Sequence, residues 1–508
     1  MPKSFRISDF KGLNERKIQG TSPQETSSLD NVVVRHGKVF GRKGINEFRG
    51  ITTASGTTPI IGLAGFYRAS TQALTVVRMT PTAVHALNTG TDVWDVITGT
   101  ALTASSTAFP NFDVIDDTLV FTNGVDRPRK YTGTGNTADI AASTAPYAKV
   151  LVAFQGLLFL ANASQNGTFT DLPGEGPIIA YYSDDWDSDW GSCTSDFIIL
   201  DETPGEIRAA RVLGRSLLFY KYDGIVRVTA ASGATRFNQE LLPFDKGIIA
   251  PLSLQTLGET GNHIFLATDM ELYVTNGQQV KALPPNVNKT LQETLSIANA
   301  KTAVGVTEHE QETYHLLYNR TGGTWLDGRI SYNFRTGEFY HASYPASLFV
   351  RALNVKLTPT TAEQIIASGT TLVYELDTGQ DDNGTALTRR YDTDWFKLGG
   401  DSYMLGAELT FAKTGACRAE VSVAKDFGTT FEHKRTYDLR GTKPSDTEVR
   451  IKYRIPSTYV GTWFNFRVRL YHDGSTNIAE LKSIEPEFEP LHETTQAVTH
   501  NVEPKAAQ

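Results

Sequence analysis

The chain is poor in cysteine and methionine, and it lacks any long apolar run. It has 2 Cys and 4 Met among 508 residues. Because Cys193 and Cys417 lie far apart and form no CxxC pair, neither a disulfide framework nor a zinc knuckle is encoded. No stretch approaches the roughly 20 apolar residues that span a bilayer, and "MPKSFRISDFKG" lacks the apolar segment of a signal peptide. We therefore expect a protein made in the cytoplasm, without a membrane span.

Positive charge is scarce overall but gathers near the N-terminus. The net charge is −8, which argues against a general nucleic-acid coat because nonspecific DNA affinity comes from Lys and Arg that neutralise phosphates. Residues 1–50 hold ten basic and five acidic side chains, a surplus of five positive charges. This arm is either a solvated basic surface or a docking surface for an acidic partner. In the second case the docking candidates are Arg35, Lys38, Arg42 and Lys43.

Helical periodicity is also scarce, and short strands dominate. Only "NVNKTLQETLSIANA", near residues 286–300, has helix-like spacing, whereas strands of five to eight residues alternate elsewhere with Gly, Asn and Asp. This pattern predicts an all-β chain. A phrase of two strands joined by a turn recurs seven times at spacings of 39 to 59 residues, beginning at Ala73, Thr118, Leu157, Ser216, His263, Glu312 and Thr371.

The period of this phrase predicts a β-propeller. A unit near 50 residues suits a four-stranded sheet, and radial closure of such sheets leaves only short, protected edges. We expect six to eight blades, about seven, over residues 51–385. A row of β-sandwiches would use the same strand lengths, but its units would be nearer 100 residues.

Three further regions flank the predicted propeller. Longer, regularly alternating strands over residues 386–490 predict one C-terminal β-sandwich. Residues 491–508 are polar and aperiodic, which predicts a flexible tail. Residues 1–50 form an N-terminal arm whose hairpin "NVVVRHGKVFGRKG" either completes the last blade or docks on a neighbouring molecule.

Signatures of catalysis and cofactor binding are missing from the sequence. HExxH, GxSxG and GxxxxGK[ST] do not occur, so we expect neither an enzyme nor a bound cofactor. "AKDFGTTF" at residues 424–431 is similar to the Asp-box of sialidases, which is a hairpin device rather than a catalytic one. There we expect Asp426 to bond backbone amides and Gly428 to adopt the positive φ.

One acidic run, "YYSDDWDSDW" at residues 181–190, needs a separate interpretation. Asp185, Asp187 and Asp189 alternate as calcium ligands do, but an EF-hand loop would next require Gly and later a bidentate Glu. Trp190 and Asp196 occupy those two positions. We interpret these aspartates, with Asp184, as turn-forming carboxylates beside two anchoring tryptophans, Trp186 and Trp190; a calcium site is the lesser alternative.

Several stretches together resemble one family of virion proteins. They are "GLNERKIQGTSPQETSSLDNVVVRHGKVFGRKG", "FTNGVDRPRKY", "IIAYYSDDWDSDWGS", "EIRAARVLGRSLLFYKYDGIVRVTAASG" and the ending "WFNFRVRLY". In this order they resemble bacteriophage short-tail hub or nozzle proteins of the packaged-DNA stabilisation, or head-completion, type. The resemblance is patchy in identity but covers most of the chain.

The resemblance implies a structural role in the virion tail. It implies a homohexameric ring below the portal and adaptor complex that retains packaged DNA and forms part of the ejection channel, through which DNA passes without sequence-specific binding. Other tail proteins such as fibres, spikes or a needle would be its neighbours. The alternative function is a receptor-binding or glycan-processing propeller, in which the aromatic and acidic side chains of residues 181–190 line a sugar site.

Overall fold

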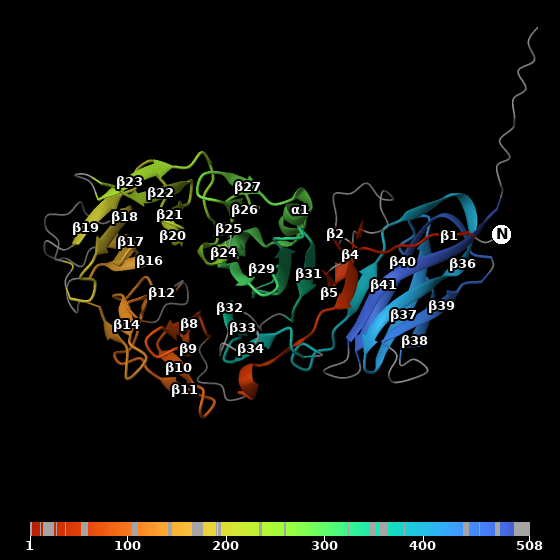
Figure 1. Cartoon of the computed structure of the whole chain (residues 1–508), viewed down its shortest axis with the longest axis horizontal. Helices are drawn as coiled ribbons and strands as arrows, with labels where there is room; N and C mark the ends of the chain where they lie inside the picture. The colour runs from red at the N-terminus through yellow and green to blue at the C-terminus, as the bar shows by residue number, and fades with distance from the viewer. Residues whose placement is uncertain are drawn as a thin grey trace, which may run out of the picture.

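The computed structural model combines a propeller with a second, barrel-like sheet (Figure 1). Its described residues are 3–10, 12–13, 25–26, 28–35, 37–51, 59–103, 110–140, 145–164, 176–188, 190, 195–232, 236–258, 261–323, 325–345, 352–355, 363–379, 381–439, 447–456, 458–472 and 478–491. Apart from Leu491, the tail predicted over residues 491–508 lies outside them. Within this part of the chain, no helix is long and apolar enough to cross a bilayer.

Among the described residues, seven sheets form the propeller, and each has a core of four antiparallel strands. Blade 1 contains β8 (Gly62–Arg68), β9 (Ala73–Met79), β10 (Val84–Asn88) and β11 (Val93–Val96). Blade 2 contains β12 (Asn111–Ile115), β13 (Thr118–Thr122), β14 (Arg129–Tyr131) and β15 (Ala138–Asp139). Blade 3 contains β16 (Tyr147–Phe154), β17 (Leu157–Ser164), β18 (Gly176–Ser183) and β19 (Ser195–Ile199). Blade 4 contains β20 (Ile207–Leu213), β21 (Ser216–Lys221), β22 (Ile225–Ala230) and β23 (Phe237–Leu241).

In two of the remaining three blades, strands from the N-terminal region take part in the sheet. Blade 5 contains β24 (Gln255–Leu257), β25 (Asn262–Leu266), β26 (Leu272–Thr275) and β27 (Val280–Ala282). Blade 6 contains β28 (Val304–Glu308), β29 (Thr313–Tyr318), β30 (Gly328–Asn333) and β31 (Phe339–Ser343), to which β2 (Gly12–Leu13) and β3 (Glu25–Thr26) add. Blade 7 contains β32 (Ala352–Val355), β33 (Gln364–Ser368), β34 (Val373–Leu376) and β7 (Ile45–Glu47).

In blades 1 to 6 the repeated phrase corresponds to the second and third strands. Two-residue turns such as Gln155-Gly156 and Asp116-Asp117 have positive φ at both positions, the backbone geometry that matches strand twist in a tight hairpin. In blade 7 the predicted start, Thr371, was wrong by one strand, because the second strand is β33 and Thr371 precedes the third. The polar residues that precede β33 hid this strand from the pattern.

Helical structure is confined to short segments. The helix α1 (Pro285–Thr294) lies between blades 5 and 6 and confirms the first part of the helix-like stretch predicted near residues 286–300, whereas the rest of that stretch is not α-helical. Within the described ranges there are also three 3₁₀ turns, η1 (Phe48–Gly50), η2 (Pro251–Ser253) and η3 (Ile297–Thr302). Buried apolar clusters fill the seams between blades: Phe159 and Phe219 meet between blades 3 and 4, and Leu63 and Ile366 meet between blades 1 and 7. Burial of this apolar surface between blades therefore contributes to the stability of the propeller.

An N-terminal strand closes the propeller. Ile45, Asn46 and Glu47 of β7 pair antiparallel with Leu376, Glu375 and Tyr374 of β34, so the outer strand of blade 7 comes from the opposite end of the chain. The hairpin that precedes it, β5 (Val32–Arg35) and β6 (Lys38–Gly41), belongs to the other domain, because β6 pairs with β41 (Ile478–Pro490). The arm predicted over residues 1–50 thus divides between the two domains.

The second domain is one nearly closed antiparallel sheet of eleven strands, here called the barrel. It takes β1, β4, β5 and β6 from the N-terminal arm and β35 to β41 from the C-terminal region (Figure 1). Strands not yet bounded are β1 (Lys3–Ser4), β4 (Ser28–Asp30), β35 (Arg389–Asp392), β36 (Phe396–Thr414), β37 (Cys417–Lys425), β38 (Glu432–Asp438), β39 (Glu448–Arg454) and β40 (Val460–His472).

The two separate sheets of the predicted sandwich are joined by a long bent strand. The 19-residue β36 pairs with β41, with β39 and with β40 in turn. At Gly406 (φ 151°) the register with β41 shifts, and a Cβ there would lie 2.0 Å from the Tyr453 carbonyl oxygen. This bend carries the hydrogen bonding around the corner, so the expected sandwich is a single barrel-like sheet.

Candidate functional sites

A buried ion pair joins the N-terminal arm to the linker between the domains. Arg42 Nη1 and Nη2 donate to the two carboxylate oxygens of Asp382 at 2.9 and 2.7 Å, and the two side chains are 0% and 4% exposed. Arg42 Nε donates to Asn31 Oδ1 at 3.1 Å, and the guanidinium carbon lies 4.4 Å from the centre of the Tyr344 ring. Burial alone would lower the pKa of Arg42, but Tyr344 and Asp382 outweigh it and the pKa is raised. The prediction that Arg42 docks a partner was wrong, because all its donors face inward.

A second ion pair, between a buried guanidinium and a carboxylate that is 34% exposed, links blades 6 and 7. Arg329 on β30 donates to the Asp377 carboxylate, which follows β34, at 2.8 and 3.2 Å. Burial would raise the pKa of Asp377, but the Arg329 guanidinium opposes it and the pKa lies below its usual range. Nearby, the His315 imidazole contacts Ser331 Oγ at 2.7 Å and Glu308 Oε2 at 3.3 Å.

We call the residues Arg42, Asp382, Arg329, Asp377, Tyr344, His315 and Glu308 the junction network. Burial lowers the pKa of His315, although the Glu308 carboxylate acts in the opposite direction. The network contacts the segment that leads into the closing strand, blades 6 and 7 and the linker, so it ties the closed end of the propeller to the segment that enters the barrel.

The other three docking candidates lie at the surface of this junction. Lys38 forms an ion pair with Glu480 of the barrel at 3.3 Å, with side chains 41% and 25% exposed. Arg35 and Lys43 line a groove of about 630 Å³ whose lining also includes Glu308, Glu363 and Glu375. Lys43 is exposed and Arg35 partly so. These two remain candidates for contact with a partner.

The tryptophans of the acidic run are buried in the seam between blades 2 and 3. Trp186 is 6% exposed and Trp190 is 1% exposed. Trp186 Nε1 donates to Asp116 Oδ2 at 3.2 Å, and Trp190 Nε1 donates to the Trp186 carbonyl at 2.7 Å. Because both rings pack in the core, neither offers a face on which a sugar could stack.

The aspartates of this run face different neighbours. Lys130 of blade 2 donates to both oxygens of Asp187 at 2.6 and 2.5 Å, whereas Asp184 lies 3.7 Å from Arg236 of blade 4. The Asp185 backbone closes the turn by accepting from Ser188 N at 3.2 Å. Asp189 lies outside the described residues, among which no group of three His, Cys, Asp or Glu side chains could hold a metal. The run therefore bridges blades 2, 3 and 4.

The Asp-box-like turn joins β37 to β38, and its carboxylate contacts the next strand. Asp426 Oδ1 accepts from Thr462 N at 2.9 Å and from Trp463 N at 3.0 Å, both on β40. The positive φ values belong to Asp426 (47°) and Phe427 (60°), so the prediction that Gly428 adopts one was wrong. The carboxylate bonds stabilise a left-handed backbone that these residues otherwise avoid.

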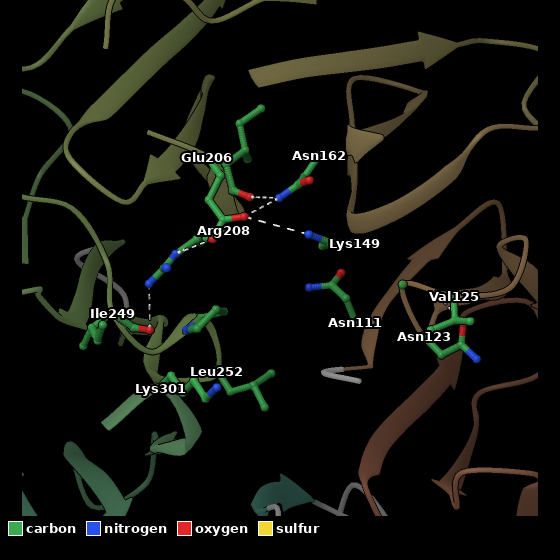
Figure 2. Close-up of a pocket in the computed structure, with 13 residues that line it drawn as sticks. Asn111, Asn123, Val125, Lys149, Asn162, Glu206, Arg208, Ile249, Leu252 and Lys301 are labelled. Atoms are coloured by element: carbon green, nitrogen blue, oxygen red, sulfur yellow. Dashed lines mark hydrogen bonds and ion pairs between the residues drawn. The ribbon is translucent and has the colours of Figure 1, made fainter. Parts of the chain in front are cut away.

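A cavity of about 400 Å³ with both polar and apolar lining lies on the inner side of the propeller. Sequence reasoning missed this cavity. It is lined from the inner strands β12, β16 and β20 and from η2 and η3, and Figure 2 shows its side chains converging from these separate blades. Its lining residues are Asn111, Asn123, Gly124, Val125, Lys149, Asn162, Glu206, Ile207, Arg208, Ile249, Pro251, Leu252 and Lys301. Because these residues are scattered over nearly 200 positions, no local motif could have revealed the cavity.

Comparison with known proteins gives structural likeness only. No family model matches the chain, and no curated protein matches it. Among solved structures, PorZ, a surface component of the type-IX secretion system of Porphyromonas gingivalis, aligns at 10% identity and a TM-score of 0.39 over 70% of this chain and 44% of PorZ. The Neurospora crassa Pan2 WD40 domain aligns at 9% identity and a TM-score of 0.39 over 68% of this chain and 97% of that domain. The chain thus spans less than half the length of PorZ.

Proposed function

We propose that this chain is a structural protein of a short-tailed bacteriophage virion, assembling into a homohexameric hub or nozzle ring below the portal and adaptor. The ring would retain packaged DNA and form part of the ejection channel. The observation that carries the proposal is the ordered series of stretches, from "LDNVVV" to "WFNFRVRLY", that resembles such proteins along most of the chain. The role is mechanical, and the chain is proposed not to be an enzyme.

The distribution of charge supports passage of DNA. The arm at residues 1–50 carries a surplus of five positive charges, so the rest of the chain carries about thirteen net negative charges. A predominantly acidic wall repels phosphates, and DNA can then slide without adhering.

The junction network supports a load-bearing role. The closing strand, two blades and the linker meet at two ion pairs whose guanidinium groups are buried, and the carboxylates of Asp382 and Asp377 are 4% and 34% exposed. Removing one member of such a pair is strongly destabilising, so the two domains are coupled through it. A subunit whose domains are so joined can transmit force around a ring without opening its propeller.

Ring closure requires a heterologous contact in which one face of a subunit meets a different face of the next. We propose that Arg35 and Lys43 of one subunit contact an acidic surface of its neighbour, because they are the docking candidates left accessible once Arg42 is buried against Asp382 and Lys38 pairs with Glu480. In the virion, adaptor, portal, and fibre, spike or needle proteins would be the further partners.

Mass photometry and negative-stain microscopy of the purified full chain test the proposal. We expect a species of about six subunits, and the double variant Arg35→Glu/Lys43→Glu should remain folded but shift toward the monomer. Lys38→Glu serves as the matched control in the same hairpin; it disrupts a contact with Glu480 inside the subunit. A chain that stays monomeric at all concentrations would contradict the proposal. Glycan hydrolysis abolished by Asp185→Asn or Asp187→Asn would support the alternative function instead.

A further inference from the structure

The inner cavity of the propeller carries more positive charge than its own acid neutralises. Three cations line it, Lys149, Arg208 and Lys301, against the single carboxylate of Glu206. They come from blade 3, from blade 4 and from the 3₁₀ turn that leads into blade 6, so the charges stand on separate walls (Figure 2).

Arg208 and Glu206 form an ion pair in the wall of the cavity. Arg208 Nε donates to Glu206 Oε1 at 3.0 Å, and its Nη1 lies 3.5 Å from the carbonyl oxygens of Ile248 and Ile249. The guanidinium also stacks on the Tyr222 ring at 4.4 Å. The other Glu206 oxygen accepts from Asn162 Nδ2 at 3.2 Å. Arg208 and Glu206 therefore form a fixed, nearly neutral pair in the wall.

The two lysines are left as a surplus. Lys149 reaches Glu206 only at 3.9 Å and its side chain is 61% exposed. Lys301 is exposed and has no ion pair among the described residues. Asn111 Oδ1 accepts from Leu151 N at 3.3 Å, an arrangement that leaves the two Nδ2 hydrogens available to the cavity. The cavity thus offers two ammonium groups and an amide donor to an acceptor that the protein itself does not provide.

Apolar groups complete the lining. Ile249 and Leu252 lie on the same side of the cavity as Arg208 (Figure 2), and Ile207 and Pro251 also line it. A volume of about 400 Å³ is at the lower end of the range that small-molecule sites occupy. It accommodates a compact organic body but not a folded domain.

We propose that this cavity binds a small organic molecule bearing at least two anionic oxygen-rich groups, carboxylates or phosphates. One group pairs with Lys149 and the Asn111 amide, and another with Lys301 across the cavity. Charge-assisted hydrogen bonds from the lysines supply most of the affinity, and the apolar wall contacts the carbon skeleton. Binding does not depend on ring assembly, so either proposal can fail while the other stands.

Isothermal titration calorimetry on the purified full chain tests this inference, with citrate as the tricarboxylate probe and inorganic pyrophosphate as the phosphate probe. Sodium chloride at matched ionic strength controls for general screening. We expect saturable binding of at least one probe, and the tighter of the two identifies the preferred group. The double variant Lys149→Ala/Lys301→Ala should weaken binding by at least about tenfold, because each lysine supplies a charge-assisted contact.

Lys281→Ala is the matched control, since Lys281 is an exposed lysine on the outer strand of blade 5 and its loss removes the same charge. It should leave affinity within about twofold. Thermal melting without ligand verifies that each variant is folded, and the single variants Lys149→Gln and Lys301→Gln replace the double variant if that one is not. Heats equal to those of sodium chloride for both probes, or equal affinity of wild type and the lysine variants, would overturn the inference.

Discussion

Two groups of aspartates in this molecule behave in opposite ways. Asp382 and Asp377 of the junction network, which are 4% and 34% exposed, are held by fully buried guanidinium groups that link distant parts of the chain. Asp184 and Asp187 of the acidic run are paired with Arg236 and Lys130 at the surface, with exposed fractions of 54% and 43% for the carboxylates. The acidic run is conspicuous in sequence, whereas the junction aspartates are not.

The difference shows that burial, rather than density of charge, decides how much a carboxylate matters to the fold. Water screens an exposed pair and leaves it worth about 0 to 1 kcal/mol. An intact buried pair adds little to the free energy of unfolding compared with apolar side chains of similar size. Removing only one partner leaves an uncompensated buried charge, which lowers the free energy of unfolding by about 3 to 5 kcal/mol. The predictions below test this contrast in order of expected effect.

Arg42→Met should have the largest effect. It leaves the Asp382 carboxylate buried without its bidentate partner, and we expect a loss of about 3 to 5 kcal/mol in the free energy of unfolding. Urea denaturation followed by circular dichroism measures it. Lys38→Met, which removes the more exposed pair with Glu480, is the control and should cost no more than about 1 kcal/mol.

The double variant Arg42→Met/Asp382→Leu separates charge from packing. Because it removes both ions, we expect it to recover a substantial part of the stability lost in Arg42→Met. The single variant Asp382→Leu completes the comparison. If the double variant loses as much free energy of unfolding as the two single variants together, packing around Arg42 and not the unpaired charge is responsible.

Acidification should weaken the junction through His315. Its pKa is lowered by burial in the folded chain, so the unfolded chain takes up the proton at higher pH, and stability falls as pH drops below about 6.5. The slope from this one group is at most about 1.4 kcal/mol per pH unit. Urea midpoints between pH 7.5 and 5 should show a shallower decline for His315→Gln than for wild type.

Three other histidines also contribute to the loss of stability as the pH falls. Burial lowers the pKa of His85, His263 and His341 to about 4, so the decline should not vanish in His315→Gln. His309→Gln, at an exposed position in the turn between β28 and β29, is the matched substitution. Parallel curves for wild type and His315→Gln would contradict the assignment of the slope to the junction.

Asp187→Asn should have a small effect, because it weakens only the exposed pair with Lys130. We expect a change within about 1 kcal/mol by urea denaturation. Trp190→Ala in the same run removes a ring that is 1% exposed, and a loss of about 3 to 5 kcal/mol there would show that the tryptophans, not the acids, hold this turn. A loss above 2 kcal/mol for Asp187→Asn would break the contrast between the two groups.

Calcium should have the smallest effect. Because Asp187 is occupied by Lys130 and Asp184 points to Arg236, we expect EDTA and added calcium to move the melting temperature by less than about 1 °C. If added calcium raises the melting temperature and Asp185→Asn abolishes that rise, the acidic run is a calcium site.

Local patterns in the sequence determined the blades. Alternation and turn residues predict strands from their nearest neighbours, so the repeat indicated about seven four-stranded units, and the apolar spacing near residues 286–300 indicated the helix. The pattern reached its limit in blade 7, where the phrase beginning at Thr371 missed β33. Polar residues precede β33, so the local sequence pattern there is weak. The strand becomes evident only from its pairing with β32 and β34.

The tertiary structure decided what joins those units. Three features depend on residues up to hundreds of positions apart. They are the strand that closes blade 7, the burial of Arg42 against Asp382, and the pair of lysines that line the inner cavity. Periodicity reports whether a side chain faces a core, but not which distant segment shares that core. Chain closure and the burial of charge arise only when these segments meet, because the electrostatic environment is set by neighbours in space.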